Sequence, residues 1–407
     1  MTTVKDSVHD HIEVDGVASD LLDTPPIQRL RRIKQLGTAT LVYPSANHTR
    51  FEHSLGVYHL ADRALDCLGI EGQQAERVRA AAMVHDVGHA PFSHNVESLL
   101  HRLTGRYHDE VDDLLGDGSV ARVLSEHGLN PDRIAALVAG EGRFGQLVSG
   151  ELDVDRMDYL VRDAHHTGVP YGTIDHQRLI RELRFVDGQL VLDEGNVQTA
   201  ESLLLARALM NPTVYNHHVS RIAKTMLRRA TEHLLETTDV EPPKLRRMDD
   251  HALMAALRDA SATEGLVRRL DERSLYKRAV WAELEAVPDD LLEADHDAVR
   301  NLERDVAAAT GLDPAAVLIE VPSLPTMTES TSRILVNGEV RRLARRSTLV
   351  SALRSAQQDQ WRLGVYAPAG DRDPVGNAAV RTLGLDIEGA MVRDVRAGIN
   401  ATLEDFE

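Results

Sequence analysis

The chain has 407 residues and a formal charge of −18, from 64 acidic and 46 basic side chains, and its length predicts more than one compact core. An acidic surface repels the phosphates of DNA and RNA, so we expect no nucleic-acid partner. Cys67 is the only cysteine, which excludes an internal disulfide and a cysteine-rich zinc site, so any metal must be held by histidine or carboxylate side chains.

The first 22 residues combine a charged segment with a predicted β-hairpin. Residues 1–11 lack the apolar stretch of a secretory signal, and no apolar run in the chain reaches the roughly 18 residues of a membrane span. We therefore expect a cytoplasmic protein without a membrane partner. Residues 8–22 alternate polar and apolar side chains around Asp15 and Gly16, which predicts a hairpin with its turn at that pair.

From Asp23 to about residue 285 the pattern is helical. An aspartate and two prolines at residues 23–26 are typical of a helix start. Apolar residues at the helical spacing predict further helices over residues 27–36, 54–68, 75–87, 153–164, 196–210 and 220–236.

Near residue 286 the pattern changes. It predicts a helix over residues 297–309, a strand over 316–321, a hairpin over 334–340 with an Asn337-Gly338 turn, a helix over 348–358 and a strand over 361–366. We therefore expect a mainly α fold, with an N-terminal β-hairpin and a helical core in residues 1–285 and a small C-terminal α/β lobe in residues 286–407.

Three motifs carry histidine or carboxylate side chains that could bind a metal. His85 and Asp86 lie side by side at the end of a predicted helix, a pairing that suits a divalent cation. The pair alone is weak evidence, because three others occur in the chain: His9-Asp10, His108-Asp109 and His296-Asp297. Neighbouring helical residues diverge by about 100°, so further ligands must come from other segments. Residues 50–54 (RFEHS) and 151–159 (ELDVDRMDY) strengthen the evidence for such a site, because they contain further histidine and carboxylate side chains.

With these motifs in this order, the chain resembles the HD-domain dNTP triphosphohydrolases, which include the vertebrate enzyme with an appended sterile-alpha-motif and bacterial dGTPase-like relatives. The resemblance covers residues 22–277, about two thirds of the chain, and is strongest over residues 28–36, 47–60, 85–94 and 153–163. It implies that residues 1–285 form an HD phosphohydrolase core. It is more specific for the family than for the substrate.

The resemblance implies one divalent transition metal per chain, with Fe, Mn, Zn and Ni as candidates. Its ligands would be His53, His85, Asp86 and Asp155, which leave room for water and a phosphate oxygen in an octahedral shell. Mg²⁺ on the substrate triphosphate is a further candidate cofactor. The alternative is that the four residues are ordinary capping or surface groups.

The resemblance implies that histidines after the His85-Asp86 pair face the triphosphate. The pair His89 and His108 matches residues tied to proton transfer, which suits a side chain that titrates near neutrality. His94 is a third catalytic candidate, and Glu97, three residues later, would orient one of these histidines. Ordinary helix-terminal or solvated histidines are the alternative.

Other matching positions are implied to bind the nucleotide. Asp163 would take the sugar 3′-hydroxyl, Tyr215 would occupy the place of a ribose 2′-hydroxyl, and Arg207 would bind the terminal phosphate. The remaining substrate-binding candidates are Gln35, Leu36, Arg50, Arg156 and Tyr159.

Two departures from the vertebrate enzyme concern phosphate binding: Asn211 stands in place of a histidine and Arg156 in place of a lysine. Pro212 should break or kink its helix.

A second nucleotide site is implied between subunits. Asp23, Gln28 and Arg31 match positions that read guanine at an activating site, and Arg273 matches a residue from another chain. We therefore expect a homo-oligomer, a dimer or larger, with an activating nucleotide as a candidate partner. A solvated helix turn with ordinary ion pairs is the alternative.

The sequence thus predicts a metal-dependent enzyme that converts dNTP and water to deoxynucleoside and inorganic triphosphate. Two alternatives remain: a general HD-type phosphatase or phosphodiesterase acting on other nucleotides, and a nucleotide-sensing binding module without turnover. Base preference, metal identity and the need for an activator do not follow from the sequence.

Overall fold

The computed structural model describes residues 2–325, 332–387 and 391–392. Contacts divide the described chain into two compact units. The first contains residues up to 268 together with 332–353, and the second contains residues 269–325 and those described after residue 353. The predicted division between residues 285 and 286 falls inside the second unit. The fold is mainly α, as the sequence predicts.

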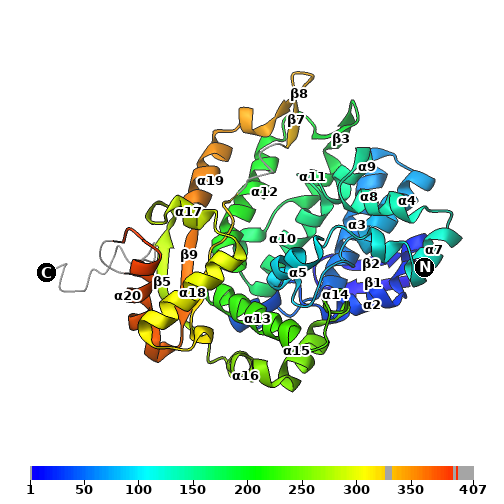
Figure 1. The fold of residues 1–407 in the computed structure, drawn as a ribbon. Helices are drawn as coiled ribbons and strands as arrows, with labels where there is room; N and C mark the ends of the chain where they lie inside the picture. The colour runs from blue at the N-terminus through cyan, green and yellow to red at the C-terminus, as the bar shows by residue number, and fades with distance from the viewer. Residues whose placement is uncertain (1, 326–331, 388–390, 393–407) are drawn as a thin grey trace. The chain divides into compact units, whose positions relative to one another are not determined.

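The first unit is built from helices around one apolar core (Figure 1). Its helices are α1 (Gly16–Leu22), α2 (Pro25–Arg29), α3 (Arg50–Leu68), α4 (Gln73–Val84), α5 (Glu97–Thr104), α6 (Asp112–Leu115), α7 (Gly118–Glu126), α8 (Pro131–Val138), α9 (Gly142–Val148), α10 (Val154–Thr167), α11 (His176–Arg181), α12 (Val197–Met210), α13 (His218–Thr237), α14 (Pro242–Arg247) and α15 (Asp250–Asp259). Two more helices, α16 (Glu264–Asp271) and α19 (Thr348–Asp359), begin in the first unit and end in the second.

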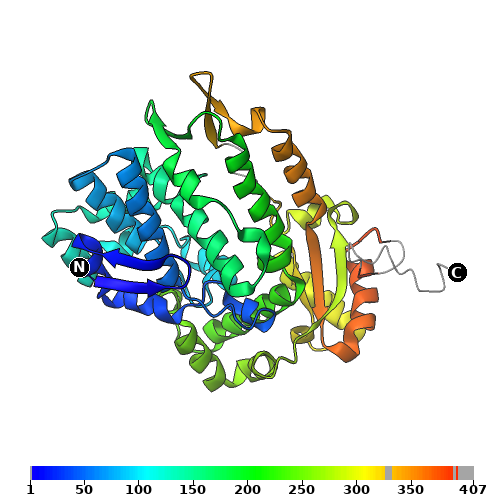
Figure 2. The ribbon, with the colours of Figure 1, turned by 180° about the vertical axis from the view of Figure 1, so that it is seen from behind.

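An N-terminal hairpin is present, but its predicted turn is wrong. Strands β1 (Thr2–Asp6) and β2 (Asp10–Val14) pair antiparallel, so the turn lies at residues 7–9 and not at Asp15 and Gly16 (Figure 2). The Asp6 carboxylate accepts the backbone N–H groups of Val8 and His9, which closes this turn. Asp15 instead precedes α1 as its N-cap residue, and Gly16, with a φ of 51°, opens that helix.

Helix α3 packs against both α4 and α10. Helix α3 contains residues 50–54 and α10 contains most of residues 151–159, the two segments that flank the His85-Asp86 pair in the sequence. Helix α3 starts with a capping box, in which the Glu52 carboxylate accepts the backbone N–H and the hydroxyl of Thr49, and it ends at Gly69 with a φ of 64°. Helix α10 is capped by Asp153, whose carboxylate accepts the Arg156 N–H at 2.7 Å. These caps fix where each helix begins, and therefore which side chains occupy its first turn.

The helix predicted over residues 27–36 is shorter than expected. After α2, a 3₁₀ turn ends at Arg32 and the backbone becomes extended at Ile33. The carbonyl of Ile33 accepts the Arg50 N–H at 2.9 Å, and the Gln35 N–H donates to the carbonyl of His48 at 3.0 Å. Pairing with residues 48–50 therefore replaces helical hydrogen bonds, and it brings residues 35 and 36 beside the start of α3.

The predicted Asn-Gly hairpin is confirmed. Strands β7 (Arg333–Val336) and β8 (Glu339–Arg342) flank Asn337 and Gly338, which have φ values of 51° and 76°, as a two-residue turn of this type requires. With β3 (Leu183–Val186) and β4 (Gln189–Leu192) they form a four-stranded sheet in the order β3-β4-β7-β8. This sheet belongs to the first unit.

The second unit is a small α/β structure with its own apolar core. Its sheet has the order β5-β9-β6, in which β9 (Arg362–Ala367) pairs antiparallel with both β5 (Lys277–Glu283) and β6 (Leu318–Glu320). Helices α18 (His296–Thr310) and α20 (Arg372–Thr382) pack against these strands, and α17 (Asp289–Leu292) is a single turn. The α/β lobe predicted from the sequence is therefore present.

Among the described helices, none combines the length and the apolar character that crossing a bilayer requires.

Candidate active site

Four side chains from three segments converge at the start of α3. His53 lies in the first turn of α3, His85 and Asp86 follow α4, and Asp155 lies in the first turn of α10. The Nε2 atom of His53 is 2.8 Å from Asp155 Oδ1, 3.3 Å from His85 Nε2 and 3.8 Å from Asp86 Oδ2. His85 Nε2 is 3.3 Å from Asp86 Oδ1. These are the four residues that the resemblance implies as metal ligands.

The hydrogen bonds behind the two imidazoles set which nitrogen faces the cluster. His53 Nδ1 lies 2.8 Å from an oxygen of Asp158, and His85 Nδ1 lies 2.8 Å from the carbonyl oxygen of Ala82. Both partners are acceptors, so each Nδ1 carries a hydrogen, and each Nε2 is the nitrogen that a metal would bind, in place of the proton that His53 Nε2 otherwise shares with Asp155. Two such nitrogens and the carboxylates of Asp86 and Asp155 make a donor set that fits a divalent transition metal.

The electrostatics of the cluster also favour a cation. Burial would lower the pKa of His53, but hydrogen bonds to Asp155 and Asp158 raise that pKa to about 10. Burial would raise the pKa of Asp86, yet the charges of Arg50 and neighbouring histidines hold that pKa well below its usual value. Hydrogen bonding to His53 similarly lowers the pKa of Asp155 against the effect of burial. The carboxylates are therefore ionised, and a bound cation would offset their charge.

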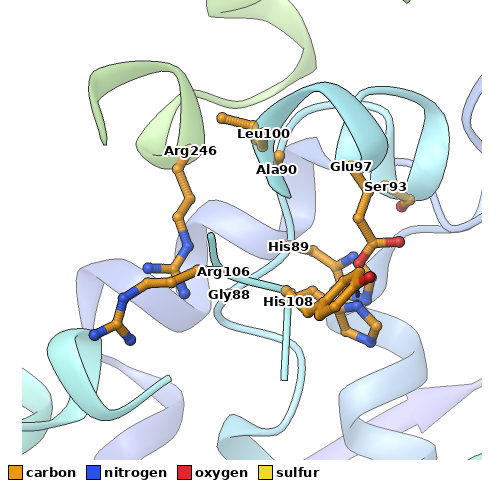
Figure 3. A pocket seen from close by; sticks show the side chains of 10 residues that line it. Gly88, His89, Ala90, Ser93, Glu97, Leu100, Arg106, His108 and Arg246 are labelled. Carbon is orange, nitrogen blue, oxygen red and sulfur yellow. Dashed lines mark hydrogen bonds and ion pairs between the residues drawn. The ribbon is translucent and has the colours of Figure 1, made fainter. Parts of the chain in front are cut away.

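A second group of histidines lies beside this cluster. Ligand atoms of His89, His94 and His108 lie within 4.8 Å of one another, and the rings of His89 and His108 stack with centroids 4.0 Å apart (Figure 3). The Glu97 carboxylate contacts His94 Nδ1 at 2.6 Å and also His108 Nδ1, so it orients two of the histidines and not just one. His89 Nε2 lies 3.3 Å from Asp86 Oδ1, which joins the two groups.

The two stacked histidines differ in their proton affinity. Burial, together with the charge of Arg50, lowers the pKa of His89 well below its ordinary value. Burial would also lower the pKa of His108, but the hydrogen bond and charge of Glu97 raise it above 6.5. His108 is therefore the better proton donor near neutral pH. Both histidines line a pocket whose wall includes Arg106 and Arg246 (Figure 3).

Further along α10, Asp163 lies between two other side chains. Its carboxylate is 2.7 Å from His48 Nε2 and accepts the Tyr215 hydroxyl at 2.9 Å. The ring of Tyr159 has its centroid 6.1 Å from that of Tyr215 and 6.5 Å from that of His53. Asp163, Tyr159 and Tyr215 are therefore brought together, on the face of α10 that Asp155 shares.

The residues predicted to bind phosphate and nucleoside have different surroundings. Arg50 is buried, and its guanidinium donates to both oxygens of Asp86, at 3.0 and 2.9 Å, and to the Ser93 hydroxyl. Arg156 donates to the backbone carbonyls of Gly150 and Glu151. Burial raises the pKa of the Tyr159 and Tyr215 hydroxyls, and Arg207, which is half-buried, lies close enough to both for its charge to oppose that rise.

Two more of these candidates lie where the chain pairs with the segment before α3. Gln35 is buried and its Oε1 has no hydrogen-bond partner in the described structure, while Leu36 is half-buried.

Pro212 has the predicted effect: α12 stops at Met210, and residues Asn211–Tyr215 form a turn of π-helix. This turn carries Tyr215 toward Asp163.

The residues predicted for a second nucleotide site lie near the start of the chain, with one exception. Gln28 donates to the carbonyl of Leu22 and accepts from Arg31 Nε at 2.9 Å, and the Arg31 guanidinium covers the ring of Phe51. Asp23 is exposed at the end of α1. Arg273 belongs to the second unit.

Three residues of this region were missed by reasoning from sequence: Asp158, His48 and His9. Asp158 is buried behind His53, and His48 is buried against Asp163. The position of Asp158 three residues after Asp155 is a signal that could have been used. The pair His9-Asp10 was counted as a chance match, although His9 Nε2 lies 2.6 Å from Asp158 Oδ1.

Comparison with known proteins assigns the family. A model of the HD domain matches residues 50–163, and a model of the HD associated region matches residues 174–394. The chain belongs to the HD-domain family. Among the relatives of this HD-domain protein, the uncharacterized protein MJ1154 of Methanocaldococcus jannaschii is 34% identical over 382 residues, or 90% of this chain and 79% of the relative.

Other relatives carry the name of an enzyme. The deoxynucleoside triphosphate triphosphohydrolase SAMHD1 homolog of Dictyostelium discoideum is 31% identical, and SAMHD1 of Homo sapiens is 29% identical. The matches cover 67% and 76% of this chain, and 59% of each relative. The HD-domain protein thus spans less than two thirds of the length of these two relatives.

Solved structures support the same family. A hypothetical protein from Aquifex aeolicus superposes with a TM-score of 0.74 at 26% identity, over 93% of this chain and 99% of the other. A phosphohydrolase from Bacteroides thetaiotaomicron superposes with a TM-score of 0.73 at 26% identity, over 90% and 100%. The HD-domain protein therefore has the fold of an HD-type phosphohydrolase.

Proposed function

We propose that the chain hydrolyses dNTPs to deoxynucleoside and inorganic triphosphate, with His53, His85, Asp86 and Asp155 as ligands of one divalent metal. The observation that carries the proposal is that Asp86 Oδ1 lies 3.3 Å from His85 Nε2 and 3.3 Å from His89 Nε2. One carboxylate thus joins the metal-ligand cluster to the histidines suited to proton transfer. The relatives named as dNTP triphosphohydrolases support the choice of substrate.

The metal, when bound, would supply a Lewis acid at the α-phosphate and lower the pKa of the attacking water. The protein's own residues must then stabilise the departure of the 5′-oxygen, which is too basic to leave as an alkoxide. We assign the proton donation to His108, and its contact with Glu97, which raises the pKa of His108 while holding its Nδ1, supports this assignment. His89, whose ring stacks on His108, is buried and uncharged and would accept hydrogen bonds or relay the proton.

Sugar and phosphate selection follow from the residues around α10 and α12. Asp163 would accept the 3′-hydroxyl, and the Tyr215 ring would exclude a 2′-hydroxyl by steric overlap. Tyr159 and Tyr215 pack with their rings edge to face, an arrangement that aromatic pairs favour. Arg207 would bind the terminal phosphate, an interaction that a monophosphate cannot make. Gln35, Leu36, Arg50 and Arg156 would complete the contacts to nucleoside and phosphate.

Chromatography of the products formed from a panel of dNTPs, NTPs and NMPs tests this function. We expect inorganic triphosphate as product, dNTPs preferred over NTPs, and near-loss of turnover in His108→Ala with the metal retained. Orthophosphate or pyrophosphate would instead indicate a general HD-type phosphatase. Nucleotides that raise the melting temperature without any product would indicate a binding module.

We also propose that Asp23, Gln28 and Arg31 bind an activating nucleotide in a homo-oligomer, with Arg273 contributed by another copy. The side chains of Gln28 and Arg31 are hydrogen-bonded to each other, so they can act as one recognition surface. Replacing Gln28 with alanine should weaken activation by added nucleotide. The basal rate at saturating substrate should not change, and a variant with unaltered activation would exclude this site.

A further inference from the structure

The carboxylate of Asp158 is the shared acceptor of a buried hydrogen-bond network behind the proposed metal centre. Its oxygens lie 2.8 Å from His53 Nδ1 and 2.6 Å from His9 Nε2, and they accept Arg162 Nε and Nη2 at 2.8 and 3.0 Å. An ionised carboxylate has about four acceptor sites, so these four contacts use all of them. Because Asp158 can only accept, His53 Nδ1 and His9 Nε2 must each carry a hydrogen.

His9 reaches this network from the turn between β1 and β2. The turn closes on Asp6, whose carboxylate accepts the backbone N–H groups of Val8 and His9 at 2.9 and 2.8 Å. The same carboxylate accepts Arg162 Nη1 at 2.8 Å. The hairpin is thus attached to Asp158 twice, directly through His9 and indirectly through Asp6 and Arg162.

Close packing of α3 against α10 leaves no room for Asp158 to move. Gly56 lies one turn after His53 in α3, and a Cβ atom at this position would overlap Asp158 Oδ1 and Arg162 Nη2. The side chain of His9 is 3% exposed, and those of Asp158 and Arg162 are fully buried. A histidine in a hairpin turn would ordinarily be solvated, so its burial on a carboxylate needs a reason beyond turn formation.

We propose that His9 is a positioning residue of the metal centre, an inference that rests on the metal ligands of the proposed function. His9 and Arg162 hold Asp158, and Asp158 holds the His53 ring so that Nε2 faces His85, Asp86 and Asp155. The N-terminal hairpin is then part of the metal site, although it supplies no ligand. Loss of such an outer partner of a metal ligand typically lowers metal affinity by about 10–100-fold.

Three variants of the full chain separate positioning of the metal from anchoring of the hairpin. His9→Phe keeps a ring beside His59, whose centroid lies 5.2 Å from that of His9, but it removes the hydrogen-bond donor. His9→Gln keeps a donor. His11→Phe is the matched control, because His11 lies on the same hairpin with its side chain exposed to solvent.

The probe is Co²⁺ alone, bound to each purified protein, with its visible absorption spectrum and its rate of loss to a chelator as readouts. We expect His9→Phe to release Co²⁺ at least about tenfold faster than the wild type and to alter the spectrum. His9→Gln and His11→Phe should stay within about twofold of the wild-type rate. If His9→Phe does not fold, His9→Asn replaces it, because its shorter amide cannot reach Asp158.

A His9→Phe or His9→Asn protein with the wild-type Co²⁺ spectrum and release rate would overturn the inference, even if its melting temperature were lower. That result would leave the proposed function intact, since the wild type would still bind the metal. A wild-type chain that takes up no Co²⁺, Mn²⁺, Fe²⁺, Zn²⁺ or Ni²⁺ would instead overturn the metal assignment, and this inference with it.

Discussion

Replacing Gly88 with alanine should displace His108 from its partners without touching a proposed metal ligand. A Cβ atom on Gly88 would overlap the backbone carbonyl oxygen of His108, and real Cβ atoms essentially never approach another atom closer than 3.0 Å. The His108 segment must therefore move by about 1 Å. A displacement of about 1 Å in an active site can lower the rate by about 10²-fold.

We therefore expect kcat for triphosphate release from saturating dNTP to fall about 100-fold in Gly88→Ala. Overpacking should also destabilise the fold by about 1–3 kcal/mol, measured by urea denaturation. Elemental analysis should find the wild-type amount of metal, because His53, His85, Asp86 and Asp155 keep their places.

Gly265→Ala is the matched control. A Cβ atom there meets no other atom within 4 Å, and the residue lies inside α16. Alanine should therefore leave kcat unchanged and stabilise the helix by up to about 1 kcal/mol. A folded, metal-loaded Gly88→Ala protein with kcat within about threefold of the wild type would refute the reasoning, because the position of His108 would then not limit the reaction.

Three other predictions follow from the site and from the charge of the chain. Asp155→Ala should lose most of the metal and the activity, since it removes a proposed ligand whose carboxylate lies 2.8 Å from His53 Nε2. A fully loaded variant in elemental analysis would show the ligand assignment to be wrong. Activity should decline as pH rises through the pKa of His108, which lies above 6.5, and Glu97→Gln should move this decline to lower pH because it removes the charge that raises that pKa. A pH-rate profile unmoved by Glu97→Gln would exclude His108 as the proton donor. In high salt, the charge of −18 is screened over less than about 10 Å. Light scattering with nucleotide under these conditions should detect a dimer or larger species. A monomer mass alone would contradict the proposed assembly.

The proposed metal ligands rest on the family resemblance, and local sequence signals specify the helix positions of two of them. His53 follows Thr49 and Glu52, which form a capping box that fixes the first turn of α3. Asp155 follows the N-cap residue Asp153 in the same way in α10. His53 and Asp155 therefore each lie at a helix start that the sequence itself specifies, whereas His85 and Asp86 follow the end of α4. The family resemblance supplied what local signals could not, namely that the three segments meet.

The errors arose where distant contacts override local preference. Asp15 and Gly16 look like a hairpin turn, yet the turn forms at residues 7–9, where the Asp6 carboxylate bonds the backbone and the buried Arg162. The helix expected over residues 27–36 ends early because Ile33 pairs with Arg50. The role of His9 could not be seen either, since its partner Asp158 lies 149 residues away in the chain.

The route of the chain between its two units determines which fragments can fold. Strand β4 gains its neighbour β7 only after residue 332, and the central strand β9 of the other sheet comes after both of its neighbours, β5 and β6. A fragment that ends at residue 285 would leave β4 as an exposed edge, which promotes aggregation. During synthesis, neither sheet can be completed until most of the chain has left the ribosome. A stop codon or protease cut before β7 would therefore leave strands of both units without a neighbour, and one between β8 and β9 would leave only β5 and β6 without theirs.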